Sequence, residues 1–335
     1  MSTQLHIINA FETAIRGSER AALEAARLLQ PGLSVTVWST VRTSPQVQAL
    51  SQEVGVAIHP IAPFAGRFPK GGVLLIWGTH FAPGVWLAAS HCDRVVIVNE
   101  LFNYSALYRC VLEVRAAGLP APSIIHVSTL LRDASALDGP LLYPTADMRA
   151  MFEIERDYDR KQAVVGRLSR DVAEKHHADD PLLYRALAAE GLVVRLMGAT
   201  VLRGALTDRP DVELLPQSAT GVAAYLSGID IFFYRTGGAG IFTEPSGLAV
   251  AEAMAAGLPV VAVRPGGFAD LFENPECGFL VDTQDEAHAA ILRLAREPAL
   301  RRVVGAAARR AARDRFGPAY TERLRQMVMG DSPAA

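Results

Sequence analysis

The sequence of 335 residues has few cysteines, almost no net charge and no long apolar run. Its cysteines, Cys92, Cys110 and Cys277, form no C-x-x-C pair, which argues against a disulfide framework or a cysteine zinc site and fits a reducing compartment. The net charge of −2 gives no general reason to expect a nucleic-acid partner. No run reaches the roughly 18 apolar residues of a membrane span, and the first residues lack the features of a signal peptide. A cytoplasmic location is therefore expected.

Several ligand-binding motifs are also missing. The first strand-to-helix turn has no G-x-G-x-x-G, which argues against a dinucleotide oxidoreductase, and the segment TGGAGIF (236–242) lacks the Gly-Lys-Ser/Thr end of a P-loop. No Asp-x-Asp motif follows a predicted strand, so we expect no metal and no cofactor. The segment Lys175-His176-His177 has no third metal ligand at a useful spacing, and we interpret it as a solvated loop.

What the sequence does contain is a regular alternation of short apolar, β-branched runs with helical patterns. Half of the residues are hydrophobic and 20% are charged, so a chain of this length can bury the cores of two domains. The clearest helix is 18–29, with Ser18 as its N-cap. Strands are predicted at 5–11, 34–40, 56–61, 72–78, 94–99 and 123–128, and again at 163–168, 192–198, 212–216, 229–234, 259–263 and 278–282.

These strands are apolar throughout, which indicates burial on both faces and hence parallel sheets. Strand–helix alternation in two successive blocks predicts two Rossmann-like, doubly wound α/β domains. The polar segment 141–162 contains the join, and the expected domains are 1–148 and 149–315. The tail 316–335 is expected to form a helix that packs back on the first domain. The arginines that precede and enter this tail form either a solvated helix face or a patch for anionic lipid or the other domain.

The segment EPSGLAVAE (244–252) carries a glutamate at each end of an apolar, helix-like stretch. It follows a buried strand, and ligands of open α/β sheets bind at the carboxyl ends of strands, near helix N-termini. A helix that starts near Ser246, Gly247 and Leu248 would bind a diphosphate there, with Gly247 allowing close approach. Glu244 and Glu252 would then accept hydrogen bonds from hydroxyls on either side of the diphosphate. The alternative is that both glutamates have local structural roles.

This segment resembles the EX7E signature of GT-B glycosyltransferases, in particular of the retaining glycosyltransferase family 4. The stretch VVGRLSRDVAEK (164–175) resembles the family's donor-domain loop, which implies that Arg167 and Lys175 bind the diphosphate. The segment GSERAALEAARLL (17–29) resembles the family's first loop and helix, which implies a phosphate contact at Gly17. The resemblance implies a GT-B fold, in which two Rossmann-like domains face a cleft. It is strong over about 163–285 and weak before 160.

The sequence departs from the family at several positions. Arg16 replaces a loop glycine, Ser246 stands where an aromatic residue is common, and eight residues separate Lys175 from Arg167. The family's histidine after the strand 94–99 is replaced by Asn99 and Glu100, so no catalytic role carries over there.

Residues near the acceptor are predicted from position alone. The segments GTHFAP (78–83) and NELFNYS (99–105) each follow a strand, and we expect one of them to contact the acceptor. The candidates are His80, Asn99 and Asn103. In the second domain, Arg170 is equally compatible with a diphosphate contact and with a surface position.

The resulting hypothesis is a metal-independent, retaining glycosyltransferase that moves a sugar from a nucleotide-diphosphate donor to a glycan, lipid-linked or small-molecule acceptor. The expected catalytic residues are Glu244, Arg167 and Lys175. Peripheral contact with the inner face of a membrane is an open possibility. The alternatives are a GT-B epimerase or phosphorylase, and a catalytically inert sugar-nucleotide-binding subunit.

Overall fold

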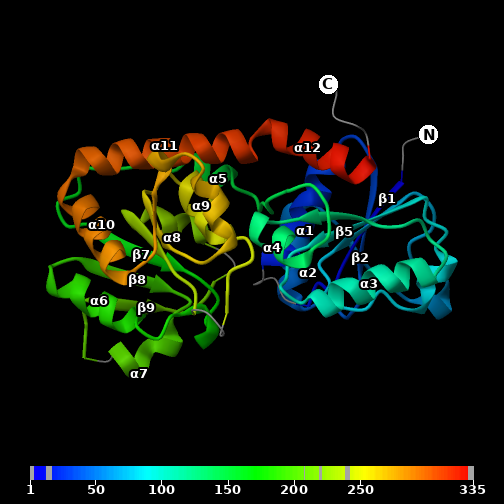
Figure 1. Ribbon diagram of the computed structural model, residues 1–335, viewed down its shortest axis with the longest axis horizontal. Coiled ribbons are helices and arrows are strands. Elements are labelled where there is room, and N and C mark those ends of the chain that lie inside the picture. The colour runs from blue at the N-terminus through cyan, green and yellow to red at the C-terminus, as the bar shows by residue number, and fades with distance from the viewer. Residues whose placement is uncertain (1–3, 13–16, 207, 219–220, 238–241, 331–335) are drawn as a thin grey trace. The chain divides into compact units, whose positions relative to one another are not determined.

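The computed structural model describes residues 4–12, 17–206, 208–218, 221–237 and 242–330, so Arg16 and most of 236–242 lie outside the described residues. The chain divides into two compact units. Unit 1 comprises Met1–Ala146 and Pro318–Ala335, and unit 2 comprises Asp147–Gly317. The units meet after Ala146 and after Gly317, and each of these boundaries lies two residues from the corresponding predicted domain limit, 148 or 315. Figure 1 labels many of the helices and some of the strands of both units.

Unit 1 is a parallel sheet of six strands with helices around it (Figure 1). The strand order is β3-β2-β1-β4-β5-β6, which is the doubly wound Rossmann order. The elements are β1 (Gln4–Asn9), α1 (Gly17–Leu29), β2 (Ser34–Ser39), α2 (Pro45–Val54), β3 (Ile58–Pro60), η1 (Pro63–Ala65), β4 (Val73–Trp77), η2 (Val85–Ala89), β5 (Arg94–Asn99), α3 (Tyr104–Ala116), β6 (Ser123–His126), α4 (Thr129–Ser135) and α12 (Pro318–Met329).

Unit 2 repeats this topology, with strand order β12-β11-β10-β7-β8-β9. Its elements are α5 (Arg149–Phe152), β7 (Val164–Leu168), η3 (Ala173–Lys175), α6 (Asp180–Ala189), β8 (Val193–Met197), η4 (Thr200–Leu202), α7 (Arg203–Leu206), β9 (Val212–Leu215), α8 (Val222–Ser227), β10 (Ile231–Tyr234), α9 (Leu248–Ala255), β11 (Val260–Val263), η5 (Gly267–Phe272), η6 (Pro275–Cys277), β12 (Phe279–Val281), α10 (Gln284–Arg296) and α11 (Pro298–Phe316).

Each of the twelve predicted strands overlaps an observed one, and the pairings within both sheets are parallel. The central strands are fully buried, as at Ile7 and Leu75 in unit 1 and at Val165 and Phe233 in unit 2. Because these strands are buried on both faces, their sequences do not alternate between polar and apolar residues. They are therefore recognisable in the sequence as continuous apolar runs.

The arginine-rich tail forms two helices that part at Gly317–Pro318, and they belong to different units. Much of the basic character of α11 is used inside unit 2: Arg301 is 1% exposed, and it donates to the carbonyls of Tyr158 and Arg160. Arg309 likewise donates to the carbonyl of Ile154. These arginines of α11 therefore hold backbone segments of unit 2 together. This role differs from the two that the sequence left open, a solvated helix face and a patch for anionic lipid or the other domain.

Helix α12 lies in unit 1, where it packs beside α1. The Nε of Arg94 donates to the carbonyl of Val328 at 2.9 Å, and the hydroxyl of Tyr320 donates to the carbonyl of Tyr143 at 2.9 Å. Among the helices described, none combines the length and the apolar character that crossing a bilayer requires.

Candidate functional site

The candidate site of unit 2 lies at the carboxyl ends of β7 and β10, the two neighbouring strands from which the sheet order runs in opposite directions. A crevice forms at such a position because the chains leaving the two strands diverge to opposite faces of the sheet. The chain leaves β7 toward Lys175, and it leaves β10 toward Glu244. Segments about 70 residues apart in the sequence therefore meet at one edge.

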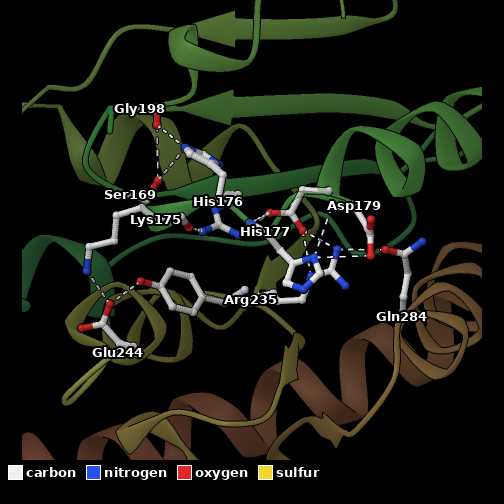
Figure 2. A network of polar contacts seen from close by, with 12 residues as sticks. Ser169, Lys175, His176, His177, Asp179, Gly198, Arg235, Glu244 and Gln284 are labelled. Atoms are coloured by element: carbon white, nitrogen blue, oxygen red, sulfur yellow. Dashed lines mark hydrogen bonds and ion pairs between the residues drawn. The ribbon is translucent and has the colours of Figure 1, made fainter. Parts of the chain in front are cut away.

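An ion pair between Lys175 and Glu244 forms the centre of this site. The Lys175 ammonium donates to Glu244 Oε2 at 2.7 Å, and Figure 2 shows the two side chains converging from opposite sides. The hydroxyl of Tyr234 donates to the same oxygen at 2.6 Å. The ammonium also lies 4.1 Å from the ring centroid of Phe242. Lys175 and Glu244 are both 8% exposed, so the two charges have little water to stabilise them.

Lys175 and Glu244 shift each other's pKa toward the ionised form. Burial by itself raises the pKa of Glu244, but the charge and hydrogen bond of Lys175 and the hydroxyl of Tyr234 hold that pKa below its usual value. Burial lowers the pKa of Lys175, and Glu244 opposes that shift. A lysine with further N–H donors beside a carboxylate can bind a phosphate oxygen and a hydroxyl at one place.

Glu244 also fixes the start of α9. Its Oε1 accepts the N–H of Gly247 at 3.4 Å, and its carbonyl accepts the N–H of Gly267 at 2.8 Å. Gly247 is the N-cap of α9 and has a φ of 80°, a left-handed conformation that side chains disfavour. A Cβ at this position would lie 2.6 Å from the Cβ of Phe268. Glycine is thus required here by conformation and by packing, in addition to the predicted approach of a phosphate.

We expect Gly247→Ala to reduce the free energy of unfolding by about 1–3 kcal/mol, because it combines a strained φ with a close contact to Phe268. Urea unfolding measures this loss. The matched control is Gly191→Ala, since Gly191 has a φ of 85° but nothing within 4 Å of an added Cβ. Gly191→Ala should show the smaller loss. Equal losses in the two variants would mean that the contact with Phe268 is relieved without cost.

The helix begins two residues later than predicted, at Leu248 rather than near Ser246. The stretch between the two glutamates is consequently helical only from Leu248 onward. Ser246 and Leu248 are half-buried, whereas Glu252 is 1% exposed within α9. The first N–H groups of a helix have no partner inside it, so this end of α9 can bind an anion.

The side chain of Arg167 lies in the interior of unit 2, and the diphosphate contact that the resemblance implied for it stays a prediction. Its side chain is 0% exposed in β7. One guanidinium nitrogen donates to the carbonyl of Lys175, another lies 3.4 Å from Asp180 Oδ2, and the group lies 5.0 Å from the ring centroid of Tyr234. The arginine therefore fixes the loop that carries Lys175.

Asp180 and Arg235 form a buried ion pair that the sequence analysis did not predict. Arg235 Nε donates to Asp180 Oδ1 at 2.8 Å, and its Nη2 donates to Gln284 Oε1 at 2.8 Å (Figure 2). Asp180 thus lies between two arginines, with Arg167 on its other side. The sequence signal for it was weak: an arginine directly after β10, and an acidic residue in the first turn of α6.

The interpretation of 175–177 as a solvated loop was wrong for two of its three residues. Lys175 is buried, and His176 is 5% exposed with its Nε2 2.9 Å from the carbonyl of Gly198. Burial and the charge of Arg167 lower the pKa of His176 to about 4, so the ring is neutral at pH 7. Arg170, by contrast, pairs with the exposed Glu174 at 2.8 Å near the surface.

The predicted residues of unit 1 occupy different environments. Gly17 is exposed and is the first residue of α1. Asn99 is fully buried, and its Nδ2 lies 3.1 Å from His126 Nδ1, so it supports the end of β5 rather than lining an open surface. Asn103 is the N-cap of α3 and accepts the N–H of Ala106 at 3.1 Å. Half-buried His80 remains near the sheet edge, with Nδ1 3.9 Å from Glu100 Oε1.

The described residues contain no group of three or more histidine, cysteine and acidic side chains arranged to hold a metal ion. The three cysteines are buried free thiols.

Part of unit 2 is similar to known proteins. Residues 207–311 match the family model described as glycosyl transferases group 1, and this segment contains Glu244 and Glu252. A stretch of 51 residues is 45% identical to a probable sucrose-phosphate synthase of Thermosipho melanesiensis. That stretch covers 15% of this chain and 12% of the relative, so the chain matches a small part of that protein.

Solved structures match nearly the whole chain at low identity. The Anabaena protein HepE, solved in complex with UDP and glucose, has a TM-score of 0.74 at 15% identity and covers 98% of this chain and 100% of its own. A glycosyltransferase from Rickettsia africae has a TM-score of 0.73 at 10% identity, covering 99% and 100%. Sucrose-phosphate synthase from Thermosynechococcus elongatus has a TM-score of 0.66 at 15% identity, covering 97% and 98%. The protein therefore has the GT-B fold, and its residues 207–311 match the model of glycosyl transferases group 1.

Proposed function

We propose that this protein is a retaining glycosyltransferase of family 4 that moves a sugar from a nucleotide-diphosphate donor to a hydroxyl-bearing acceptor. The observation that carries the proposal is the ion pair between Lys175 and Glu244 beside the start of α9. Glu244 lies within the segment 207–311 that matches the group 1 family model, and Lys175 precedes that segment in the sequence. A cation, a carboxylate and a helix N-terminus together suit a diphosphate that is linked to a sugar.

Each residue has a defined role in this proposal. Lys175 keeps one N–H on Glu244 and donates another to the leaving diphosphate, whose charge grows as the bond to the sugar breaks. The N–H groups at the start of α9 bind the same diphosphate. Glu244 accepts from the donor sugar, and Glu252 accepts from the ribose. Arg167 acts through the Lys175 loop as a positioning residue. The bound donor is a UDP-, GDP-, ADP- or dTDP-sugar.

We expect Glu252→Ala to weaken the binding of free nucleotide diphosphate by about 1.5–3 kcal/mol, the usual size for a hydrogen bond to a charged group. A thermal-shift screen over UDP, GDP, ADP and dTDP first selects the nucleotide, because a ligand at 100 times its Kd stabilises by about 2.7 kcal/mol. Calorimetry with that nucleotide then compares the variant with Glu190→Ala, a change at an exposed glutamate of unit 2. Unchanged affinity in a folded variant would remove Glu252 from the site.

We expect EDTA to leave the rate of transfer unchanged. Lys175 and the N-terminus of α9 supply the positive charge that a divalent ion supplies in other transferases. The measurement is nucleotide release at saturating donor, before and after chelation and again after manganese is restored. A rate that collapses with EDTA and recovers with manganese would contradict the proposed site chemistry.

The inward-facing Arg167 favours one second candidate, a catalytically inert sugar-nucleotide binder, since a site lacking one phosphate contact would bind without reacting. Turnover separates the two. A nucleotide sugar that binds but undergoes neither transfer nor slow hydrolysis would support the inert binder.

A further inference from the structure

The loop between β3 and β4 of unit 1 carries the most exposed large hydrophobic side chain of the described residues. Phe64, in η1, has a relative exposure of 104%, so its ring is as open to solvent as in an extended peptide. Phenylalanine is among the residue types that are most often buried, because removing its ring from water is strongly favourable. The full exposure of Phe64 therefore indicates a surface that is covered by something outside this chain.

Backbone hydrogen bonds close the loop around Phe64. The N–H of Ala62 donates to the carbonyl of Arg67 at 2.7 Å, and the N–H of Arg67 donates to the carbonyl of Ala62 at 3.1 Å. Within this bridge, the N–H of Gly66 donates to the carbonyl of Pro63 at 2.9 Å, and Gly66 has a φ of 69°. Phe64 thus lies at the tip of a closed turn, which has little conformational freedom left to lose when a partner binds it.

The base of the loop is anchored in unit 1. Half-buried Phe68 packs against the hydrophobic cluster that contains Trp86, and the two ring centroids are 6.2 Å apart. Trp86 belongs to η2, in which the neighbouring Val85 is 85% exposed. The ring contact therefore joins the loop to a second segment that also presents an apolar side chain to solvent.

The charges that accompany Phe64 along the chain are of one sign. The segment 54–92 contains Arg67 and Lys70 but no aspartate or glutamate, although the whole chain has a net charge of −2. Both side chains are exposed, and neither forms an ion pair with any residue that the structure describes. The Lys70 ammonium lies 4.7 Å from the ring centroid of Phe68, which keeps it beside the loop. These two cations attract a partner with a negative surface.

We propose that the loop 61–70 docks this protein on an anionic lipid bilayer, with Phe64 inserted at the boundary of headgroups and acyl chains and with Arg67 and Lys70 at the headgroups. A protein partner would need about 800 Å² of complementary surface, whereas one ring on a narrow turn offers little area. Lipids rearrange around a protruding ring, and the cations beside it then reach lipid phosphates. This inference goes beyond the proposed function and does not depend on it.

The first test is sedimentation of the full chain with vesicles, either of phosphatidylcholine alone or of phosphatidylcholine and phosphatidylglycerol in equal parts. We expect the protein to bind the anionic vesicles about fivefold more tightly or better, because each lysine or arginine near a charged bilayer contributes about that factor. Added salt should reduce this preference, since it screens exposed charges. Absence of binding to the anionic vesicles at low salt would overturn the proposal.

Matched variants assign the binding to this loop. Phe64→Ser should lower the partition coefficient about tenfold and leave the thermal unfolding midpoint unchanged, because the ring is fully exposed. Leu182→Ser, at a residue of unit 2 that is 61% exposed, should bind like the wild-type protein. Equal losses in these two variants would overturn the assignment.

The charge is tested in the same way. Arg67→Ser with Lys70→Ser should remove the preference for anionic vesicles. The control is Arg302→Ser with Arg310→Ser, a change at two exposed arginines of α11, which should keep that preference. A greater loss in the α11 variant would place the lipid contact on the arginine-rich helix and reject the loop 61–70.

Insertion is measured with a fluorescent label at the tip. Ala65→Cys places an exposed thiol beside Phe64, and the three native cysteines are buried, so an environment-sensitive dye should attach at position 65. On anionic vesicles its emission should shift to the blue and be quenched by lipids that carry a spin label on the acyl chain. Binding without either change would reject insertion of the tip. These assays use neither nucleotide nor turnover, so their failure would leave the glycosyltransferase proposal standing.

Discussion

Glu244→Gln is expected to lower kcat and kcat/KM for sugar transfer about 100-fold or more, while the affinity for free nucleotide diphosphate changes little. The substitution keeps the shape of the side chain but removes the charge that faces the donor sugar in the proposed function. This charge would matter most when the sugar becomes cationic as the diphosphate leaves. The measurements are transfer rate with the selected donor and calorimetry with the sugar-free nucleotide. The control is Glu276→Gln, an exposed glutamate of unit 2. Parallel loss of transfer and nucleotide affinity would mean that Glu244 contacts the nucleotide.

A loss of stability must be separated from this loss of activity. Glu244→Gln leaves the Lys175 ammonium buried without a charged partner, and breaking such a pair costs about 3–5 kcal/mol. The double variant Lys175→Met with Glu244→Gln removes both charges, so it should recover much of the stability but none of the transfer. Recovery of both would show that the glutamate acts on the fold alone.

Asp180→Asn is expected to lower the free energy of unfolding by about 3–5 kcal/mol, as much as the loss of charge at Glu244. Asp180 is 0% exposed and lies between Arg167 and Arg235, which are 0% and 8% exposed. Removing its charge leaves two buried guanidinium groups close together with no anion between them. Urea unfolding should show a lower midpoint at an unchanged slope.

The matched control for this change is Asp179→Asn at the preceding residue, whose side chain is 58% exposed. Its effect should stay within about 0.5 kcal/mol, the usual range for a surface substitution. If Asp180→Asn is as mild as this control, water or a neighbouring acid must replace the lost charge, and Asp180 would not be what stabilises the two buried arginines.

Secondary structure was predictable because it depends on local pattern. Runs such as 72–78 and 229–234 are apolar over the length of a strand, and each lies where the structure has one. The split of the tail at Gly317–Pro318 follows from the same local chemistry, since proline begins a helix readily and cannot continue one. The start of α9 was placed two residues early because Gly247, in a left-handed conformation, caps the helix instead of entering it.

The sequence by itself determined the two parallel-sheet units and the start of a helix within the segment 244–252, because strand burial and helix initiation are encoded over a few residues. The tertiary structure alone decided which charges meet. Lys175 contacts Glu244 across 69 positions of sequence, and Asp180 contacts Arg235 across 55. The inward turn of Arg167 was decided in the same way, because a buried charge takes the orientation that gives it a partner, and the partner is supplied by the fold.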